Sequence, residues 1–279
     1  MQISTHIHAV KIPFSVPTPA GAIERFVYVY LICAEQVTLI DSGVAGSEEP
    51  IFAYLESLGR KRAINAMFLT HSHPDHIGAA RAIHSATGCS VLAGAGEQDW
   101  IEDTDRQARE RPVPGFSTLV GGPVTLDRIL VAGELLKLGD GVTLEVVATP
   151  GHSAGSLSFF LHEEGALFSG DAVPVPGDLP IYDDYRTSIA TLERLQHLDG
   201  VRLLLEAWQE PKSVAVAERL AAGIAWLNEV NAAVTQTGTH EPDAMILCRN
   251  VVTKLGLSPL AVNPLVARSL CSHTATQRF

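Results

Sequence analysis

The hexapeptide at residues 71–76, His-Ser-His-Pro-Asp-His, constrains this chain more than any other part of its sequence. It directly follows the apolar run at residues 66–70, which is typical of a buried strand. A strand that ends in three imidazoles and one carboxylate places several potential ligands within one short turn. Because zinc and iron(II) accept neutral imidazole and carboxylate as ligands, the hexapeptide predicts a metal site at a strand end.

Two further motifs lie downstream and also follow expected strands. They are Thr-Pro-Gly-His at residues 149–152 and Ser-Gly-Asp-Ala at residues 169–172, and a weaker Asp-Ser-Gly turn lies upstream at residues 41–43. In order and approximate spacing these motifs resemble the metallo-β-lactamase superfamily, and the resemblance covers roughly residues 5–211. It implies an α/β (α+β) fold, the αββα sandwich, with the metal where both sheets end.

The resemblance also implies roles for individual residues. His71, His73 and His152 would form one metal site, whereas Asp75, His76 and Asp171 would belong to a second, with Asp171 bridging the two. Two neighbouring ions can lower the pKa of a bridging water and leave open positions for a substrate. Asp75 is the expected catalytic residue, because it can orient the metal-activated hydroxide or accept its proton.

The last ligand of the family pattern is missing. The family usually ends its final strand with Gly-His-Gly, but the segment here places Trp208 at the histidine position, and an indole N–H can only donate. The second site is then weaker or empty, or a replacement ligand completes it. The candidate replacements are oxygen ligands from the same segment or histidines from further along the chain: Glu206, Gln209, Glu210, His240 and His273.

Periodicity and turn residues indicate the remaining elements. Amphipathic spacing predicts helices at 47–59, 76–87 and 187–198. The charged stretch 96–111 is expected to be a solvated helix face, or alternatively a lid over the metal, and 112–124 an apolar loop. β-Branched and aromatic runs predict strands at 26–32, 37–40, 64–70, 90–93, 129–131, 134–138, 142–148, 156–162, 166–169 and 201–205.

The pattern changes after Pro211. Residues 1–211 form the expected metallo-β-lactamase-like domain, and 212–279 a helical extension with helices at 212–229, 242–256 and 258–271. Because the extension carries neither a metal motif nor a strand pattern, we expect it to cap the active site or to form a homodimer interface.

Charge and hydropathy exclude some partners. The net charge of −11 disfavours nucleic-acid binding. No apolar run reaches the length that a bilayer requires, and no leader pattern opens the chain, so we expect a cytoplasmic protein without a membrane partner. The four cysteines form no Cys-x-x-Cys pair and are expected to be reduced thiols.

These features predict an enzyme that acts on a small molecule. We expect a metallohydrolase, similar to the glyoxalase II-like branch, that cleaves a (thio)ester, lactone or phosphodiester with one or two divalent ions. Zinc is the expected ion, with iron or manganese as alternatives. A mononuclear iron dioxygenase of persulfide-type substrates, using His71, His152 and Asp171, is the first alternative. A ligand-binding protein with a degenerate metal site is the second.

Overall fold

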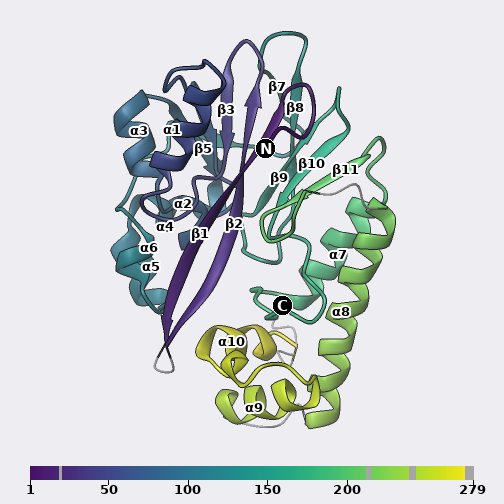
Figure 1. The fold of residues 1–279 in the computed structure, drawn as a ribbon. Helices are drawn as coiled ribbons and strands as arrows, with labels where there is room; N and C mark the ends of the chain where they lie inside the picture. The colour runs from purple at the N-terminus through teal and green to yellow at the C-terminus, as the bar shows by residue number, and fades with distance from the viewer. Residues whose placement is uncertain (19–20, 212–214, 239–242, 274–279) are drawn as a thin grey trace. The chain divides into compact units, whose positions relative to one another are not determined.

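The computed structural model describes residues 1–18, 21–211, 215–238 and 243–273. The chain divides into two compact units that alternate along the sequence. Figure 1 labels their helices and strands. Unit 1 contains residues 1–148, 155–170 and 200–213, and unit 2 contains residues 149–154, 171–199 and 214–279. The predicted domain boundary after residue 211 stays a prediction.

Unit 1 contains two β-sheets within its described residues. The first has six strands in sequence order, antiparallel from β1 to β3 and parallel from β3 to β6; the second has five in the order β11-β10-β9-β8-β7, and only β10 and β11 pair in parallel. The strands are β1 (Ile7–Thr18), β2 (Gly21–Cys33), β3 (Val37–Ile40), β4 (Ala66–Phe68), β5 (Ser90–Gly94), β6 (Arg128–Leu130), β7 (Leu135–Lys137), β8 (Thr143–Ala148), β9 (Leu157–Leu161), β10 (Ala166–Gly170) and β11 (Leu203–Glu206).

Strand β2 shows how the layers of unit 1 are built. Successive side chains of a strand point to opposite faces. Val27 and Val29 therefore join a core shared with neighbouring helices, whereas Tyr28 and Tyr30 join a core that contains residues of both sheets. The first sheet is thus buried on both faces, which explains why β2 has a continuous apolar run instead of an alternating one.

The helices of unit 1 depart from the sequence prediction in three places. The predicted helix at 76–87 is divided at Gly78, where a Cβ atom would lie 2.2 Å from the Leu119 carbonyl oxygen. The stretch 96–111 is three short helices and not one. Asp99, Asp105 and Glu110 are exposed, as a solvated face requires, whereas Glu97 and Gln107 are buried. The elements are α1 (Glu48–Ser57), α2 (Pro74–Ile77), α3 (Ala80–Thr87), the 3-10 helix η1 (Ala95–Glu97), α4 (Gln98–Glu102), α5 (Thr104–Glu110) and α6 (Phe116–Leu119), the last within the predicted loop.

Unit 2 is helical in its described residues. The helices are α7 (Tyr185–Gln196), α8 (Val216–Thr237), α9 (Ala244–Lys254), the 3-10 helix η2 (Pro259–Ala261) and α10 (Pro264–Cys271). Trp226, Val230 and Val234 of α8 are buried in a third core together with Val251 of α9 and Val266 of α10. Helix α8 extends eight residues beyond the predicted end at 229, since its apolar spacing continues to Val234.

The predicted fold class is confirmed. The chain is a mixed α/β protein with two β-sheets and with helices in its C-terminal part. Among the residues that the structure describes, we find no helix with the length and apolar character needed to cross a bilayer.

Candidate metal centre

The candidate ligands of unit 1 lie where parallel strands end. Strands β3, β4 and β5 are parallel neighbours, so their carboxyl ends share one edge of the first sheet. Asp41 directly follows β3, and His71 lies three residues beyond the end of β4. The Thr70 backbone N–H donates to Asp41 Oδ1 over 2.7 Å. This hydrogen bond connects the segments that follow β3 and β4, immediately before the hexapeptide begins.

In the second sheet, too, candidate ligands follow strands that end at one edge. Strand β9 is antiparallel to both β8 and β10, so β8 and β10 end at the same edge. His152 follows β8 after a short turn, and Asp171 directly follows β10. At Gly170 a Cβ atom would lie 2.7 Å from Thr70 Oγ1, so only glycine allows the end of β10 to approach Thr70 this closely. The Leu157 backbone N–H, at the start of β9, also donates to the Thr70 carbonyl oxygen over 2.9 Å.

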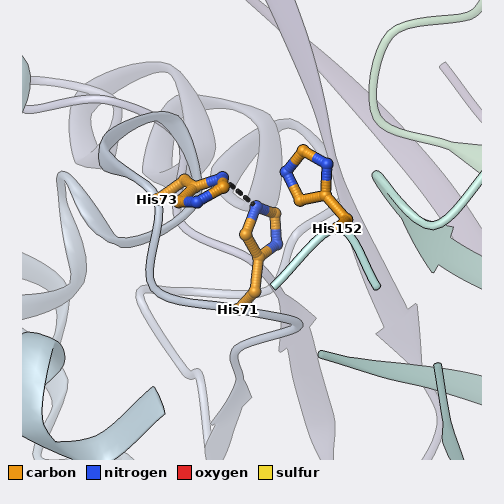
Figure 2. A group of neighbouring side chains, drawn as sticks. All are labelled: His71, His73 and His152. Atoms are coloured by element: carbon orange, nitrogen blue, oxygen red, sulfur yellow. Dashed lines mark hydrogen bonds between the residues drawn. The ribbon is translucent and has the colours of Figure 1, made fainter. Parts of the chain in front are cut away.

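Three imidazoles form the first group of potential ligands. One ligand atom from each of His71, His73 and His152 lies within 4.8 Å of the others, and all three side chains are buried. Figure 2 shows the three rings as neighbours, with His71 Nε2 separated from His73 Nδ1 by 3.0 Å.

This donor set fits a tetrahedral divalent metal ion such as zinc. Zinc–nitrogen bonds are about 2.0–2.1 Å long, which places two imidazole nitrogens of one tetrahedral zinc roughly 3.3 Å apart. The 3.0 Å separation of the His71 and His73 nitrogens is close to that value. Three protein ligands leave the fourth tetrahedral position open, which is the arrangement of catalytic zinc sites.

A second group combines imidazole with carboxylate. Ligand atoms of His71, His76 and Asp171 also lie within 4.8 Å of one another. Asp171 Oδ2 is 3.5 Å from His152 Nε2, so this carboxylate lies beside a member of the first group. Asp75 is in neither group, although its Oδ2 is 3.5 Å from His76 Nε2. The structure thus brings five of the six predicted ligands into two overlapping groups.

Asp41 contacts His76 directly and His71 through Thr70. Its Oδ2 accepts a hydrogen bond from His76 Nδ1 over 2.8 Å, which leaves His76 Nε2 as the ring nitrogen available to a metal. Thr70 Oγ1 lies 2.9 Å from the same Asp41 oxygen and 3.0 Å from His71 Nδ1. The sequence marked Asp41 only as part of a family turn. Its place at the end of a strand parallel to β4 is the signal that points to a supporting role.

Trp208 lies on the β1–β2 hairpin. Its ring contacts the edge of the Phe14 ring, with centroids 6.2 Å apart, and the Arg25 guanidinium lies 4.9 Å from its centroid. Of the proposed oxygen replacements, Glu206 is buried, whereas Glu210 is exposed. Neither carboxylate is in a ligand group of the described residues. His240 lies outside the described residues.

His273, the other proposed replacement, belongs to a hydrogen-bonded cluster in unit 2. Its Nε2 lies 2.6 Å from the Tyr182 hydroxyl and its Nδ1 lies 3.0 Å from Asn231 Oδ1. Burial lowers the pKa of His273 to about 4 and raises the pKa of Tyr182. Since the Asn231 oxygen accepts from Nδ1, Nε2 accepts from Tyr182, and both ring nitrogens are engaged by protein groups.

Comparison with known proteins identifies relatives of the chain. The sequence profile of the metallo-β-lactamase superfamily matches residues 22–208. A hydroxyacylglutathione hydrolase of Rhodospirillum rubrum is 32% identical over 149 residues, which are 52% of this chain and 47% of that protein. Hydroxyacylglutathione hydrolase GloC of Haemophilus influenzae is 31% identical over 165 residues (57% and 72%). Acyl-coenzyme A thioesterase MBLAC2 of Gallus gallus is 36% identical over 111 residues (37% and 40%). The match to the Rhodospirillum enzyme thus spans less than half of that protein.

Solved structures share the fold across nearly the whole chain. The metallo-β-lactamase family protein TTHA1429 from Thermus thermophilus aligns with a TM-score of 0.73 at 21% identity, covering 95% of this chain and 91% of that one. A β-lactamase domain protein from Burkholderia ambifaria gives a TM-score of 0.73 at 20% identity, covering 96% and 86%. The relatives named above are hydrolases, which agrees with the predicted enzyme class. Because the family profile matches more than half of its length, the chain belongs to the metallo-β-lactamase superfamily.

Proposed function

We propose that this protein is a metal-dependent hydrolase of a small thioester or ester. The observation that carries the proposal is the group of three buried imidazoles, whose ligand atoms lie within 4.8 Å of one another at the strand ends. Structural zinc sites are usually closed by four protein ligands, whereas three ligands leave a position open for chemistry. The donor set therefore supports a catalytic ion.

Each candidate residue has a distinct task in this proposal. His71, His73 and His152 would hold the first ion, and Asp171 would contact it and a second ion held with His76. A divalent ion bound there supplies a Lewis acid and lowers the pKa of water. Asp75 would orient the attacking water and accept its proton. Its side chain keeps 16% of its accessible surface, although its Oδ2 atom is buried.

The relatives support a thioester or an ester as the substrate class. Two of them are named hydroxyacylglutathione hydrolases and a third is named an acyl-coenzyme A thioesterase. A metal ion can promote the hydrolysis of a thioester and of an oxygen ester in the same way, because it activates water and stabilises the charge that develops on the carbonyl oxygen. Lactones and phosphodiesters remain in the predicted range, because the same activated water attacks them.

The test is a metal-dependent activity panel. Protein freed of metal with a chelator would be reloaded with zinc, manganese or iron(II), and assayed with S-lactoylglutathione, acetyl-coenzyme A, an aliphatic lactone and bis(p-nitrophenyl) phosphate. We expect zinc to restore thioester hydrolysis, and His73→Ala to abolish it. His197→Ala is the matched control, because His197 is exposed and its Nδ1 contacts the Glu193 carbonyl oxygen of its own helix. Full activity of His73→Ala, or of the metal-free protein, would contradict the proposal.

The second ligand group favours one alternative. His71, His76 and Asp171 supply two imidazoles and one carboxylate, the composition that suits a mononuclear iron(II) oxygenase. In this group His76 stands where the sequence prediction for such an enzyme placed His152. In that case the purified protein would contain iron, and adding a persulfide such as glutathione persulfide would consume dioxygen. Zinc content together with thioesterase activity and no oxygen uptake would eliminate this alternative.

A further inference from the structure

Glu97 is a buried carboxylate outside the predicted ligand set. It ends η1, directly beyond β5, and only 2% of it is accessible to solvent. A carboxylate is costly to bury unless hydrogen bonds compensate for the water that it loses. Strand β5 is parallel to β4, so Glu97 follows the strand next to the one that delivers His71. Its donors therefore indicate what this carboxylate holds in place.

The donors to Glu97 come from two segments that adjoin metal ligands. Glu97 Oε2 accepts from the Ser72 backbone N–H over 2.9 Å and from the Ser72 hydroxyl over 2.5 Å. Glu97 Oε1 accepts from the Gly155 backbone N–H over 2.7 Å. Ser72 lies between His71 and His73, and Gly155 lies three residues beyond His152. One carboxylate thus joins the turn with two candidate ligands to the segment that follows the third.

Gln107 holds the same turn from the other side. Its side-chain amide N–H donates to the Ser72 carbonyl oxygen over 2.5 Å, and Gln107 is fully buried. Ser72 is thereby fixed through both its backbone N–H and its backbone carbonyl. The side chains of a His-x-His pair take their directions from the backbone of the residue between them, so the two buried groups restrict where His71 and His73 point.

Glycines allow the two segments to come this close. A Cβ atom at Gly94 would lie 2.4 Å from the Gly155 carbonyl oxygen, and a Cβ atom at Gly155 would lie 2.7 Å from the Gly96 Cα atom. Both obstacles are backbone atoms and cannot turn aside as a flexible side chain can. In the sequence Gly-Ala-Gly-Glu at residues 94–97, the glycines allow the Gly155 segment to come close, and Glu97 then accepts a hydrogen bond from that segment.

From these contacts we propose that Glu97 is a positioning residue of the metal centre. It fixes the distance between the His71–His73 turn and the segment after His152, so that three imidazoles can reach one ion without rearrangement. This inference rests on the proposed function, since it assumes that the three histidines bind a metal. It adds a residue that contacts neither the ion nor the substrate.

The carboxylate is needed for its two acceptor oxygens. At least three donors face Glu97, and a glutamine of the same size would direct an N–H group at Ser72 or at Gly155. Glu97→Gln therefore preserves the packing and breaks at least one of the contacts. Loss of groups that orient ligands typically weakens metal affinity roughly 10–100-fold, and we expect an effect of this size.

The experiment measures metal binding directly on the full chain. Zinc dissociation constants would be obtained by competition with a chromophoric chelator, and the d–d spectrum of the cobalt(II)-loaded protein would report ligand geometry. The variants are Glu97→Gln and the matched control Glu110→Gln, which alters an exposed carboxylate near the end of α5 that pairs with Arg106. We expect Glu97→Gln to raise the zinc dissociation constant roughly 10–100-fold, to change the cobalt spectrum and to recover turnover in excess zinc. The control should match the wild type.

Wild-type zinc affinity and an unchanged cobalt spectrum in Glu97→Gln would overturn the inference, even if its melting temperature fell. If Glu97→Gln does not fold, Ser72→Ala removes one hydroxyl contact and must still weaken zinc binding. Wild-type protein that binds no metal would overturn the proposed function and this inference together. Metal binding and hydrolysis in the wild type with an unaffected Glu97→Gln variant would overturn only the role of Glu97.

Discussion

Replacing Asp41 with asparagine tests whether the residues behind the ligands determine metal affinity. Asp41 is buried and has a positive φ of 59°, a conformation that asparagine tolerates as readily as aspartate. The substitution therefore leaves the backbone preference intact and changes only the acceptors. Asp41 Oδ1 accepts from the Thr70 backbone N–H and Oδ2 accepts from His76 Nδ1. Whichever way the amide is turned, one of these donors faces an N–H group.

The expected magnitude follows from the lost contact. A hydrogen bond to a charged acceptor contributes about 1.5–3 kcal/mol, so the free energy of unfolding of the metal-free Asp41→Asn variant should fall by about that amount. With His76 no longer oriented, zinc affinity should fall roughly 10–100-fold, which corresponds to about 1.4–2.7 kcal/mol of binding free energy. Both quantities can be measured, by urea denaturation of the metal-free protein and by chelator competition.

Asp140→Asn is the matched control. Asp140 is the other non-glycine residue with positive φ among the described residues, at 51°, and it is exposed. The control thus removes the same charge from the same backbone conformation, away from the histidines. The reasoning is refuted if Asp41→Asn binds zinc as tightly as Asp140→Asn does, because Asp41 would then have no influence on the ligands.

Three further outcomes are expected. At a zinc concentration 100 times its dissociation constant, chelation should remove about 2.7 kcal/mol of unfolding free energy, and the His73→Ala variant should lose almost none. Trp208→His should raise the metal content per chain measured by elemental analysis, and an unchanged content would refute Trp208 as the reason for a weak second site. His273 has a pKa of about 4 in the folded protein, despite the opposing effect of Asp184, against about 6.5 when unfolded. Its neutral form therefore contributes stability above pH 6.5 that is lost as the pH falls towards 4, up to roughly 3 kcal/mol. A urea-denaturation series across this pH range should be flatter for His273→Gln, in which Tyr182 and Tyr185 keep their neighbours, than for the wild type.

The candidate metal ligands were accessible from the sequence because each follows a strand with a clear apolar pattern. The parts that were missed have physical reasons. Strand β1 contains Pro13 and Pro17, which argue against a central strand, but β1 is the edge of its sheet and proline is tolerated there. It pairs antiparallel with β2, the next strand along the chain, so the two prolines and not a distant partner explain why β1 was missed.

Glu97 was missed for a different reason. Its neighbours include several acidic and basic residues, and such a run is normally a solvated helix face. What separates Glu97 from Asp99 is its position directly beyond a parallel strand, next to glycines that admit a second segment. Periodicity describes one element at a time, whereas the burial of Glu97 depends on Ser72 and Gly155, which are distant in sequence.

The alternation of the two units has a consequence for how the protein is made. The turn that carries His152 lies in unit 2, where the Asp183 backbone N–H donates to the Gly151 and His152 carbonyl oxygens over 2.9 and 3.2 Å. The neighbouring Tyr182 is held in turn by Ser269, whose hydroxyl accepts from the Tyr182 backbone N–H over 2.9 Å. The hydrogen bonds that support His152 thus continue, within unit 2, from Asp183 and its neighbour Tyr182 to Ser269 of α10.

A ribosome delivers these segments in chain order, and domains generally fold as units as they emerge. Both sheets of unit 1 can pair once residue 206 has emerged, more than sixty residues before Ser269 does. The nascent chain therefore contains its histidines for some time before Ser269, the last residue in the contacts that support His152, has been made. If the histidines bind a metal as proposed, stable metal uptake would occur only at the end of biosynthesis, and chains released early would contain the complete histidine motif and yet retain the ion poorly.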